Sequence, residues 1–481
     1  MLPAFPPLVD VPGHIGRYHV AAAIAQSAAL QQHWAFHWRL IGNLGVDLLV
    51  MPLQPLLGPV LAAKLVIMTI PALFVLGLIL LSRACDGRQS PALWAAFPLA
   101  YSFPFQFGFV NFVLSAALAI LALALWIRLG KQRRLWLRAV LFVPVSALLW
   151  TAHSFGWGMF GLFAFASEWQ RLRCADRRHP IALVFACLAC VPLMLPIVPM
   201  AVEARNSGGG LGIQYDWLAK IFWALTVLRE RWFGYDIACT ALLFTLPIVA
   251  LRQARNFYFE PTLGLLAVVA FATFLALPRL LLGGAYVDAR MVGIALALAL
   301  AAIRCRDGSE ENRLAIIAAC FFVLRTTTTA FALFWFARGQ AQALDVVAAI
   351  PRGATVLVVV NEPCRNFWRS DRLEHVDGIA IARRDIFDNG QWTIAGQQLI
   401  AARHPSAGTY RSDPSQLAYP TRCEPETTTL PNAIRQFDRS TFGYIWTMDF
   451  PSRPRLAPDV IRVWSNDVST LYQVSDDHQT R

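Results

Sequence analysis

Asp10 is the residue whose surroundings best suit a general base. It lies in the segment LVDVPGHIGRYHVA, whose prolines restrict the backbone on both sides and help to hold the carboxylate in place. His14, Arg17 and Tyr18 follow at a spacing that puts them on one face of a helix. A carboxylate, an imidazole and a guanidinium together suit acid/base chemistry beside an anionic phosphate, with Asp10 and His14 as catalytic residues and Arg17 as a ligand. The alternative is a capping aspartate on a surface helix.

Two further polar residues and a pair of histidines follow in the same region. Arg39 and Asp47 flank the Gly-containing turn LIGNLGVD, and we expect them to line the same cavity as Asp10. His33 and His37 stand four residues apart, a spacing that can bind a metal. No third ligand is nearby in sequence, and neighbouring tryptophans favour an amphipathic role, so the sequence predicts no metal site here.

A second cluster lies in LPRLLLGGAYVDARM, residues 277–291. Arg279, Asp288 and Arg290 are predicted at the outer ends of two membrane spans, where paired guanidinium groups can bind a phosphate. The alternative is a structural salt bridge between Asp288 and one of these arginines. Arg325 is predicted near the middle of a span, where a charged group almost always faces a cavity or a partner. His153, at an outer helix turn, is expected to be structural.

The composition of the chain indicates which kind of structure holds these residues. Of the 481 residues, 57% are hydrophobic and 15% are charged, against about 25% charged in soluble domains. The mean hydropathy is +0.48. Many apolar runs approach the length of about 20 residues that crosses a bilayer. The sequence predicts a bundle of about ten transmembrane helices, at residues 57–82, 91–104, 108–128, 138–151, 154–169, 181–202, 237–251, 262–282, 290–304 and 314–337.

Loop charge orients the predicted bundle. Arginine and lysine cluster in five short loops, which with ten spans all fall on one side, the cytoplasmic one. The loops contain Arg83 and Arg88; Arg128 to Arg138; Arg171 to Arg178; Arg252 and Arg255; and Arg304 to Arg313. This arrangement accounts for the net charge of +12, because positive and negative residues balance from residue 338 onward. Such a distribution excludes a nucleic-acid-binding protein.

The same orientation puts both termini outside the cytoplasm. The predicted domains are an extracytoplasmic first loop, 1–56, with an interfacial helix over about 14–38, the helical domain, 57–337, and an extracytoplasmic domain, 338–481. No cleavable signal peptide is visible, and an outer N-terminus without a preceding anchor suggests that a first helix is missing.

The segment after residue 345 is predicted to be a small α/β domain. ATVLVVV, residues 354–360, is a β-branched run after a turn signal and indicates a buried strand. Cys364 and Cys423 are the two cysteines of this segment. Because an extracytoplasmic compartment is oxidising, we expect them to form a disulfide; the alternative is two free thiols.

These features resemble the GT-C superfamily of membrane glycosyltransferases, and most closely its uncharacterised bacterial members. The likeness rests on the first-loop Asp followed by Pro and His, on the Trp–Arg and Gly-rich turn WRLIGNLGVD, and on the long bundle with an outer C-terminal domain. The stretch LEHVDGIAIARRDIFDNGQWTIAGQQLI, 373–400, also looks like a segment of those proteins.

The resemblance implies a hexosyl- or pentosyltransferase of the bacterial inner membrane. Such an enzyme takes a sugar from a polyprenyl-phosphate carrier and passes it to a glycan or lipid acceptor in the periplasm. The catalytic carboxylate would be Asp10, and Arg279 and Arg290 would hold the carrier phosphate. The first loop has one acidic residue where many members have two adjacent ones, which leaves the use of a divalent metal, and activity itself, open.

Two other classes of function remain as alternatives. One is a transporter or flippase for a lipid-linked or anionic substrate, although the sequence shows no internal repeat and most polar clusters are predicted at the outer edge. The other is a non-catalytic protein of envelope biogenesis. A pathway around Arg325 open to both sides would favour transport.

Overall fold

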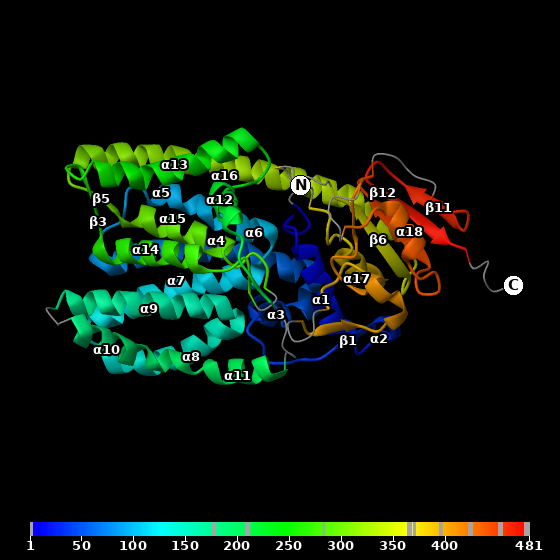
Figure 1. Cartoon of the computed structure of the whole chain (residues 1–481), viewed down its shortest axis with the longest axis horizontal. Helices are drawn as coiled ribbons and strands as arrows, with labels where there is room; N and C mark the ends of the chain where they lie inside the picture. Colours follow the sequence, from blue (N-terminus) through cyan, green and yellow to red (C-terminus); the bar gives the residue numbers. More distant parts are fainter. Residues whose placement is uncertain are drawn as a thin grey trace. The chain divides into compact units, whose positions relative to one another are not determined.

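The computed structural model describes residues 3–175, 179–206, 212–281, 284–362, 368, 372–393, 398–421, 427–450 and 456–475 (Figure 1). The chain divides into two compact units. The first, which we call the N/C unit, comprises Met1–Arg39, Asp47–Val66 and Ala332–Arg481. The second, the helical unit, comprises Leu40–Val46 and Ile67–Phe331. The predicted first loop and C-terminal domain thus fall largely in one unit.

The helical unit is built almost entirely of helices. Two short antiparallel ladders join its loops, one between β2 (Ile213–Gln214) and β4 (Leu280–Leu281), the other between β3 (Phe257–Phe259) and β5 (Ile303–Cys305). The helices, some of which extend into the N/C unit, are α3 (Gly45–Val50), α4 (Gln54–Asp86), α5 (Leu93–Ala96), η1 (Phe97–Tyr101), α6 (Phe103–Phe107), α7 (Val110–Lys131), α8 (Leu135–Ala152), α9 (Ser154–Arg173), α10 (His179–Cys190), η2 (Val191–Met194), α11 (Ile197–Asn206), α12 (Trp217–Leu225), α13 (Phe233–Arg252), α14 (Pro261–Ala276), α15 (Ala289–Ala302) and α16 (Gly308–Leu344).

Five of the described helices are long and apolar enough to cross a membrane: α4, α7, α8, α13 and α16. This is fewer than the ten predicted spans. Prolines explain part of the difference, because they begin new helical segments where the sequence alone shows one apolar run. Pro98 and Pro104 start η1 and α6, and α6 ends at Gly108, whose φ of 106° is left-handed. Shorter apolar helices lie at Pro180–Met194, Pro261–Ala276 and Ala289–Ala302.

The core of the helical unit surrounds α15. Nearly all residues of this helix are buried, and most are Ala, Leu or Gly. A helix that is apolar all round belongs in the interior of a bundle. Its small side chains let the neighbouring helices approach closely, as at Gly293, where an added Cβ would lie 3.1 Å from the hydroxyl of Ser102.

The five basic loops meet at one end of the helical unit, marked by β3 and β5 in Figure 1. Arg304 donates to both carboxylate oxygens of Asp86, with the Nε bond at 2.8 Å. Lys131 donates to the carbonyl of Cys85, and Arg306 lies 5.1 Å from the ring of Tyr258. These contacts agree with the loop-charge argument, which requires all five loops on one side of the membrane.

The N/C unit contains a small sheet built mostly from the C-terminal segment, with strand order β11-β12-β10-β6-β7 and β9 beside β6. The central strand β6 is buried and runs parallel to β7, β9 and β10, which confirms the strand predicted at 354–360. The strands are β6 (Thr355–Asn361), β7 (Phe387–Asp388), β9 (Leu417–Ala418), β10 (Tyr444–Met448), β11 (Val460–Ser465) and β12 (Ser469–Val474); the helices are η3 (Asp345–Ala349), α17 (Gly378–Arg384), η4 (Pro405–Arg411) and α18 (Leu430–Gln436).

The N-terminal segment is not the single interfacial helix predicted over 14–38. It forms α1 (Val11–Ala23), α2 (Ala28–His33) and the strand β1 (Trp34–Phe36). Ser27 caps α2 through its hydroxyl, which starts a new helix. The extended Trp34–Phe36 run pairs with β8 (Ile400–Ala402), a partner that local helix propensity does not reveal.

Glycines let α1 pack directly on α17. A Cβ added to Gly378 would lie 2.3 Å from the carbonyl oxygen of Pro12, and one added to Gly16 would lie 2.7 Å from the carbonyl oxygen of Gly378. Both distances are shorter than real Cβ contacts, so the two helices approach backbone to backbone. Gln391 adds a hydrogen bond of 2.9 Å from its side-chain amide to the carbonyl of Gly13. The segment that contains Asp10 is thereby fixed against residues 375–392.

Candidate functional site

Asp10 occupies the N-cap position of α1 and is buried. Its side chain makes no capping hydrogen bond to the first turn of the helix, so the capping alternative does not describe this carboxylate. One turn later the ring of His14 stacks with that of Tyr18 at 6.2 Å, as expected for residues on one helix face.

A histidine of the C-terminal segment lies close to the Asp10 carboxylate. His375 Nε2 lies 3.8 Å from Asp10 Oδ1 and 3.9 Å from Asp413 Oδ1. Both distances are too long for hydrogen bonds. The other ring nitrogen, Nδ1, lies 3.1 Å from the carbonyl oxygen of Gly390, which can only accept, so Nδ1 is the protonated nitrogen.

Burial lowers the pKa of His375, although Asp413 and the Gly390 carbonyl act in the opposite direction. The imidazole is therefore neutral near pH 7, and Nε2 presents a lone pair to the two carboxyl groups. Trp392 packs on this ring with centroids 4.2 Å apart and on His14 with centroids 5.1 Å apart. The indole thus joins the two histidines and limits the movement of both.

Two buried aspartates, Asp377 and Asp388, lie beside the segment that contains Gly390. Asp388 accepts a hydrogen bond of 3.1 Å from the backbone N–H of Gly390. Burial raises the pKa of Asp388 to about 7. Burial, and then the neighbouring Asp388 carboxyl, raise the pKa of Asp377 well above its ordinary value. At neutral pH the pair therefore holds at least one proton, which lets two carboxyl groups lie together without full charge repulsion.

Arg17 is buried and forms an ion pair with Asp47 at 2.8 Å. The same guanidinium donates to Gln398 Oε1 at 3.0 Å, and exposed Arg39 donates to the backbone carbonyl of Gln398 at 3.1 Å. Three of the predicted site residues thus meet around Gln398. Arg17 is already paired in this arrangement, so a phosphate would have to compete with Asp47 for it.

His375, Asp377, Asp388, Trp392 and Asp413 were not predicted as site residues. The first four lie within the stretch 373–400 that carries the family resemblance, so that stretch was the available signal. Asp413 lies beyond it, and nothing in the local sequence distinguishes it from a surface aspartate.

The arginines of the second cluster have partners other than those expected. Arg279 pairs with Asp216 at 3.1 Å, and both side chains are partly exposed. Asp288 is fully buried, accepts from Lys220 at 3.3 Å and caps α15 through the N–H of Ala289. The expected salt bridge of Asp288 with Arg279 or Arg290 is therefore replaced by one with Lys220. Lys220 lies with Trp223 on the buried face of α12, while most of the other apolar residues of this helix are exposed.

Arg290 lies among aromatic rings, with its guanidinium carbon 4.8 Å from the centre of Phe109 and 5.3 Å from that of Phe112. Its Nη1 is 3.3 Å from Nε2 of His153. His153 caps α9 by accepting the N–H of Phe155 at Nδ1, which agrees with its predicted structural role. Arg290 also lines a cavity of about 30 Å³, room for about one water molecule.

Arg325 lies near the middle of α16, as predicted, and has charged partners. It pairs with Asp236 at 2.7 Å and with Glu230 at 3.0 Å, and it donates to the carbonyl of Leu228. Asp236 belongs to the first turn of α13, and α16 begins earlier than predicted, at Gly308. Arg325 is 1% exposed and pairs with two carboxylates, so the partner expected for a charged group within a span is present.

The histidine pair and the cysteines complete the sequence predictions. His33 donates from Nε2 to the Gly353 carbonyl and lies 2.9 Å from His404 through Nδ1, while His37 follows a strand and is exposed. Among the described residues, no group of three or more His, Cys, Asp or Glu side chains is arranged to hold a metal ion. Cys364 and Cys423 lie outside the described residues, so their disulfide stays a prediction.

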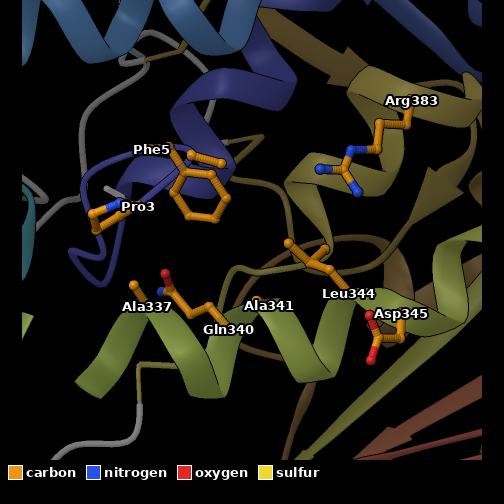
Figure 2. Close-up of a pocket in the computed structure, with 9 residues that line it drawn as sticks. Pro3, Phe5, Ala337, Gln340, Ala341, Leu344, Asp345 and Arg383 are labelled. Atoms are coloured by element: carbon orange, nitrogen blue, oxygen red, sulfur yellow. The ribbon is translucent and has the colours of Figure 1, made fainter. Parts of the chain in front are cut away.

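A larger cavity of the N/C unit lies away from this chemistry. Its volume is about 240 Å³, and Figure 2 shows Phe5 and Pro3 facing the part of α16 that carries Gln340 and Leu344. Arg383 is the cation nearest this space. Asp10, His14 and His375 do not line it. We therefore base the candidate site on the contacts of Asp10.

Comparison of the chain with protein-family models, with curated proteins and with solved structures gave no match. The function is therefore inferred from the helices, the charge distribution and the contacts of Asp10 and Arg290. Asp10 belongs to the N/C unit and Arg290 to the helical unit.

Proposed function

We propose that this chain is an integral membrane glycosyltransferase of the GT-C type. It would move a sugar from a polyprenyl-phosphate carrier to a glycan or lipid acceptor on the periplasmic side of a bacterial inner membrane. The observation that carries the proposal is Asp10, a buried carboxylate that does not cap its helix and lies 3.8 Å from a neutral histidine. Five long apolar helices and one basic end support the membrane setting.

The proposal includes ten crossings. The five long helices would supply half of them, and α9, α14 and α15 three more. Two crossings would be broken, α5–η1–α6 and α10–η2–α11, each interrupted by proline. Discontinuous helices occur in membrane proteins where the freed backbone groups find partners inside the protein. With ten crossings, all five basic loops would lie on the same side of the membrane.

Asp10 is the base in the proposed reaction. It would take the proton of an acceptor hydroxyl while that oxygen attacks the anomeric carbon of the sugar. The bond between the anomeric carbon and the carrier phosphate breaks in the same displacement, and the electron pair leaves with the phosphate, so the anomeric centre inverts. The His375 ring, held by its Nδ1–H bond to the Gly390 carbonyl and by Trp392, would limit the space open to the carboxylate by packing, which makes it a positioning residue.

Arg290 is the proposed ligand of the carrier phosphate. His153 accepts a backbone N–H at Nδ1, so its neutral ring carries the proton on Nε2. That N–H faces the guanidinium of Arg290 at 3.3 Å, which brings two donors together. An anion placed between them would accept from both, and phosphate is the anion that a carrier lipid provides. The cavity of about 30 Å³ would have to widen, so we expect the surrounding phenylalanine rings to move on binding.

Transfer of a radiolabelled sugar from polyprenyl-phosphate-sugar, measured in membranes, tests the proposal. We expect Asp10→Asn to lower the rate by about 10²–10⁴-fold, the usual contribution of a positioned general base. Asp385→Asn is the matched control, because Asp385 is another buried carboxylate of the N/C unit, held by His19, Ser27 and Arg352. Rates are compared per amount of monodisperse protein. A wild-type rate in Asp10→Asn would remove Asp10 from the mechanism.

A further inference from the structure

A polar cavity lies at the basic end of the helical unit, away from the predicted outer site residues. Its volume is about 230 Å³, enough for a phosphate group with part of a substituent. The cavity is formed where α4, α7, α8, α9 and α14 meet. Its charged lining residues are Lys131, Arg138, Glu168, Arg171 and Glu260.

The lining carries three cations against two carboxylates. Glu168 binds two of the cations, Arg138 at 2.8 Å and Arg171 at 2.5 Å. Glu260 uses its carboxylate to cap α14 at the N–H of Leu263. One positive charge therefore remains in excess around the cavity, which favours an anionic ligand.

Trp126 gives a second indication of a ligand. Its side chain lines the cavity and is 1% exposed, and its ring lies 4.0 Å from the guanidinium carbon of Arg138. The indole N–H has no hydrogen-bond acceptor among the described residues. A buried donor without an acceptor costs about 1–3 kcal/mol, and an anion in the cavity would supply one.

The position of the cavity indicates where the anion comes from. Trp136, at the start of α8, is 81% exposed, as is typical of tryptophans at the level of lipid headgroups. The adjacent loop contains Arg133 and Arg134, which are also exposed. The cytoplasmic leaflet presents anionic phospholipids, and basic pockets between helices on that side bind their headgroups.

We propose that this cavity binds an anionic phosphate group, held by Lys131 and Arg171 at its accessible side and by Arg138 and Trp126 within. The phosphate can come from the headgroup of an anionic phospholipid or from free inorganic phosphate. Arg138 and Arg171 would share their charge between Glu168 and the phosphate. The site is independent of the proposed sugar transfer, because it involves none of the residues assigned to that reaction.

The test compares ligand binding to delipidated, detergent-solubilised protein by native mass spectrometry. The probes are phosphatidylglycerol, phosphatidylcholine and inorganic phosphate. The variant Lys131→Gln/Arg171→Gln removes two cations from the lining but keeps side chains that donate hydrogen bonds. The matched control, Arg133→Asn/Arg134→Gln, removes two cations from the neighbouring loop that do not line the cavity. Asparagine suits position 133 because its φ is 57°.

The wild type and the control are expected to bind phosphatidylglycerol about tenfold more tightly than the Lys131→Gln/Arg171→Gln variant, as two lost charge-assisted contacts entail. Competition by inorganic phosphate would identify free phosphate as sufficient, whereas its failure to compete would identify the lipid headgroup. Equal affinity in both variants, or equal binding of phosphatidylcholine by the wild type, would overturn the proposal. Thermal unfolding of both variants without ligand checks that they are folded.

Discussion

The two ring nitrogens of His375 face different neighbours, and this decides what the side chain can do. Nδ1 is committed to the Gly390 carbonyl, so only Nε2 can respond to Asp10 and Asp413. Because burial lowers its pKa, the ring stays neutral and does not form a full ion pair with either carboxylate. A neutral neighbour stabilises a carboxylate less than a cation would.

Protonation of the Asp377–Asp388 pair makes stability depend on pH. The folded state keeps a proton on Asp388 up to about pH 7, whereas an unfolded aspartate releases it near 3.8. The folded state therefore binds more protons between these values, and the free energy of unfolding falls as pH rises through this window. We expect Asp388→Asn to be more stable than the wild type at pH 8 and to show a flatter pH profile.

Thermal unfolding of the purified protein at pH 5 and pH 8 measures this effect. Asp385 is a control whose pKa is shifted in the opposite direction. Burial acts to raise the pKa of Asp385, but hydrogen bonds from His19 and Arg352 lower it overall. Its carboxylate is charged at both pH values, so Asp385→Asn should lower the unfolding temperature at pH 5 and at pH 8. An unchanged slope in Asp388→Asn would show that the pair does not hold the proton.

At the scale of elements, the crossing of α1 and α17 determines whether Asp10 meets His375. The crossing has no room for a side chain at Gly16, where an added methyl would lie 2.7 Å from the Gly378 carbonyl. Gly16→Ala is expected to lower the free energy of unfolding by about 1–3 kcal/mol, the usual cost of overpacking. Chemical denaturation of the purified protein would measure the loss.

Gly339 is the matched control for that substitution. It lies in α16 within the N/C unit, and an added Cβ would meet no atom within 4 Å. Gly339→Ala should stabilise the helix by about 1 kcal/mol, the difference in helix propensity between the two residues. If both substitutions had the same effect, the close approach of α1 and α17 would not be important for stability.

Sequence periodicity predicted the helices and strands better than it predicted which distant segments contact one another. The long apolar helices and strand β6 follow from local composition, because a continuous apolar run or a β-branched run has few alternatives. The pairing of Trp34 with Ala402 and the approach of His375 to Asp10 depend on segments far apart in the chain, and no local pattern encodes them. Lys220 was missed because a polar residue on an apolar helix normally faces outward.

At the scale of the whole molecule, the excess of positive charge lies in the loops between the apolar helices and not in the C-terminal segment. The ten proposed crossings would put the basic loops in the cytoplasm and the C-terminus outside it. Alkaline phosphatase fused after residue 481 should therefore be active, and green fluorescent protein at the same position should be dark. Fusions after Arg133, in a basic loop, should give the opposite pair of results. Fluorescence at residue 481 would refute the assigned orientation and, with it, periplasmic chemistry at Asp10.

The N/C unit draws on both ends of the polypeptide, and this has a consequence for biosynthesis. Arg17 and its hydrogen-bond partner Gln398 are 381 residues apart. At about 5–20 residues per second, translation separates their emergence by roughly 20 to 80 s. During that interval the nascent N-terminal helix lacks its final partner, so a ribosome-bound chain ending before β8 should expose α1 and β1 to proteases or chaperones.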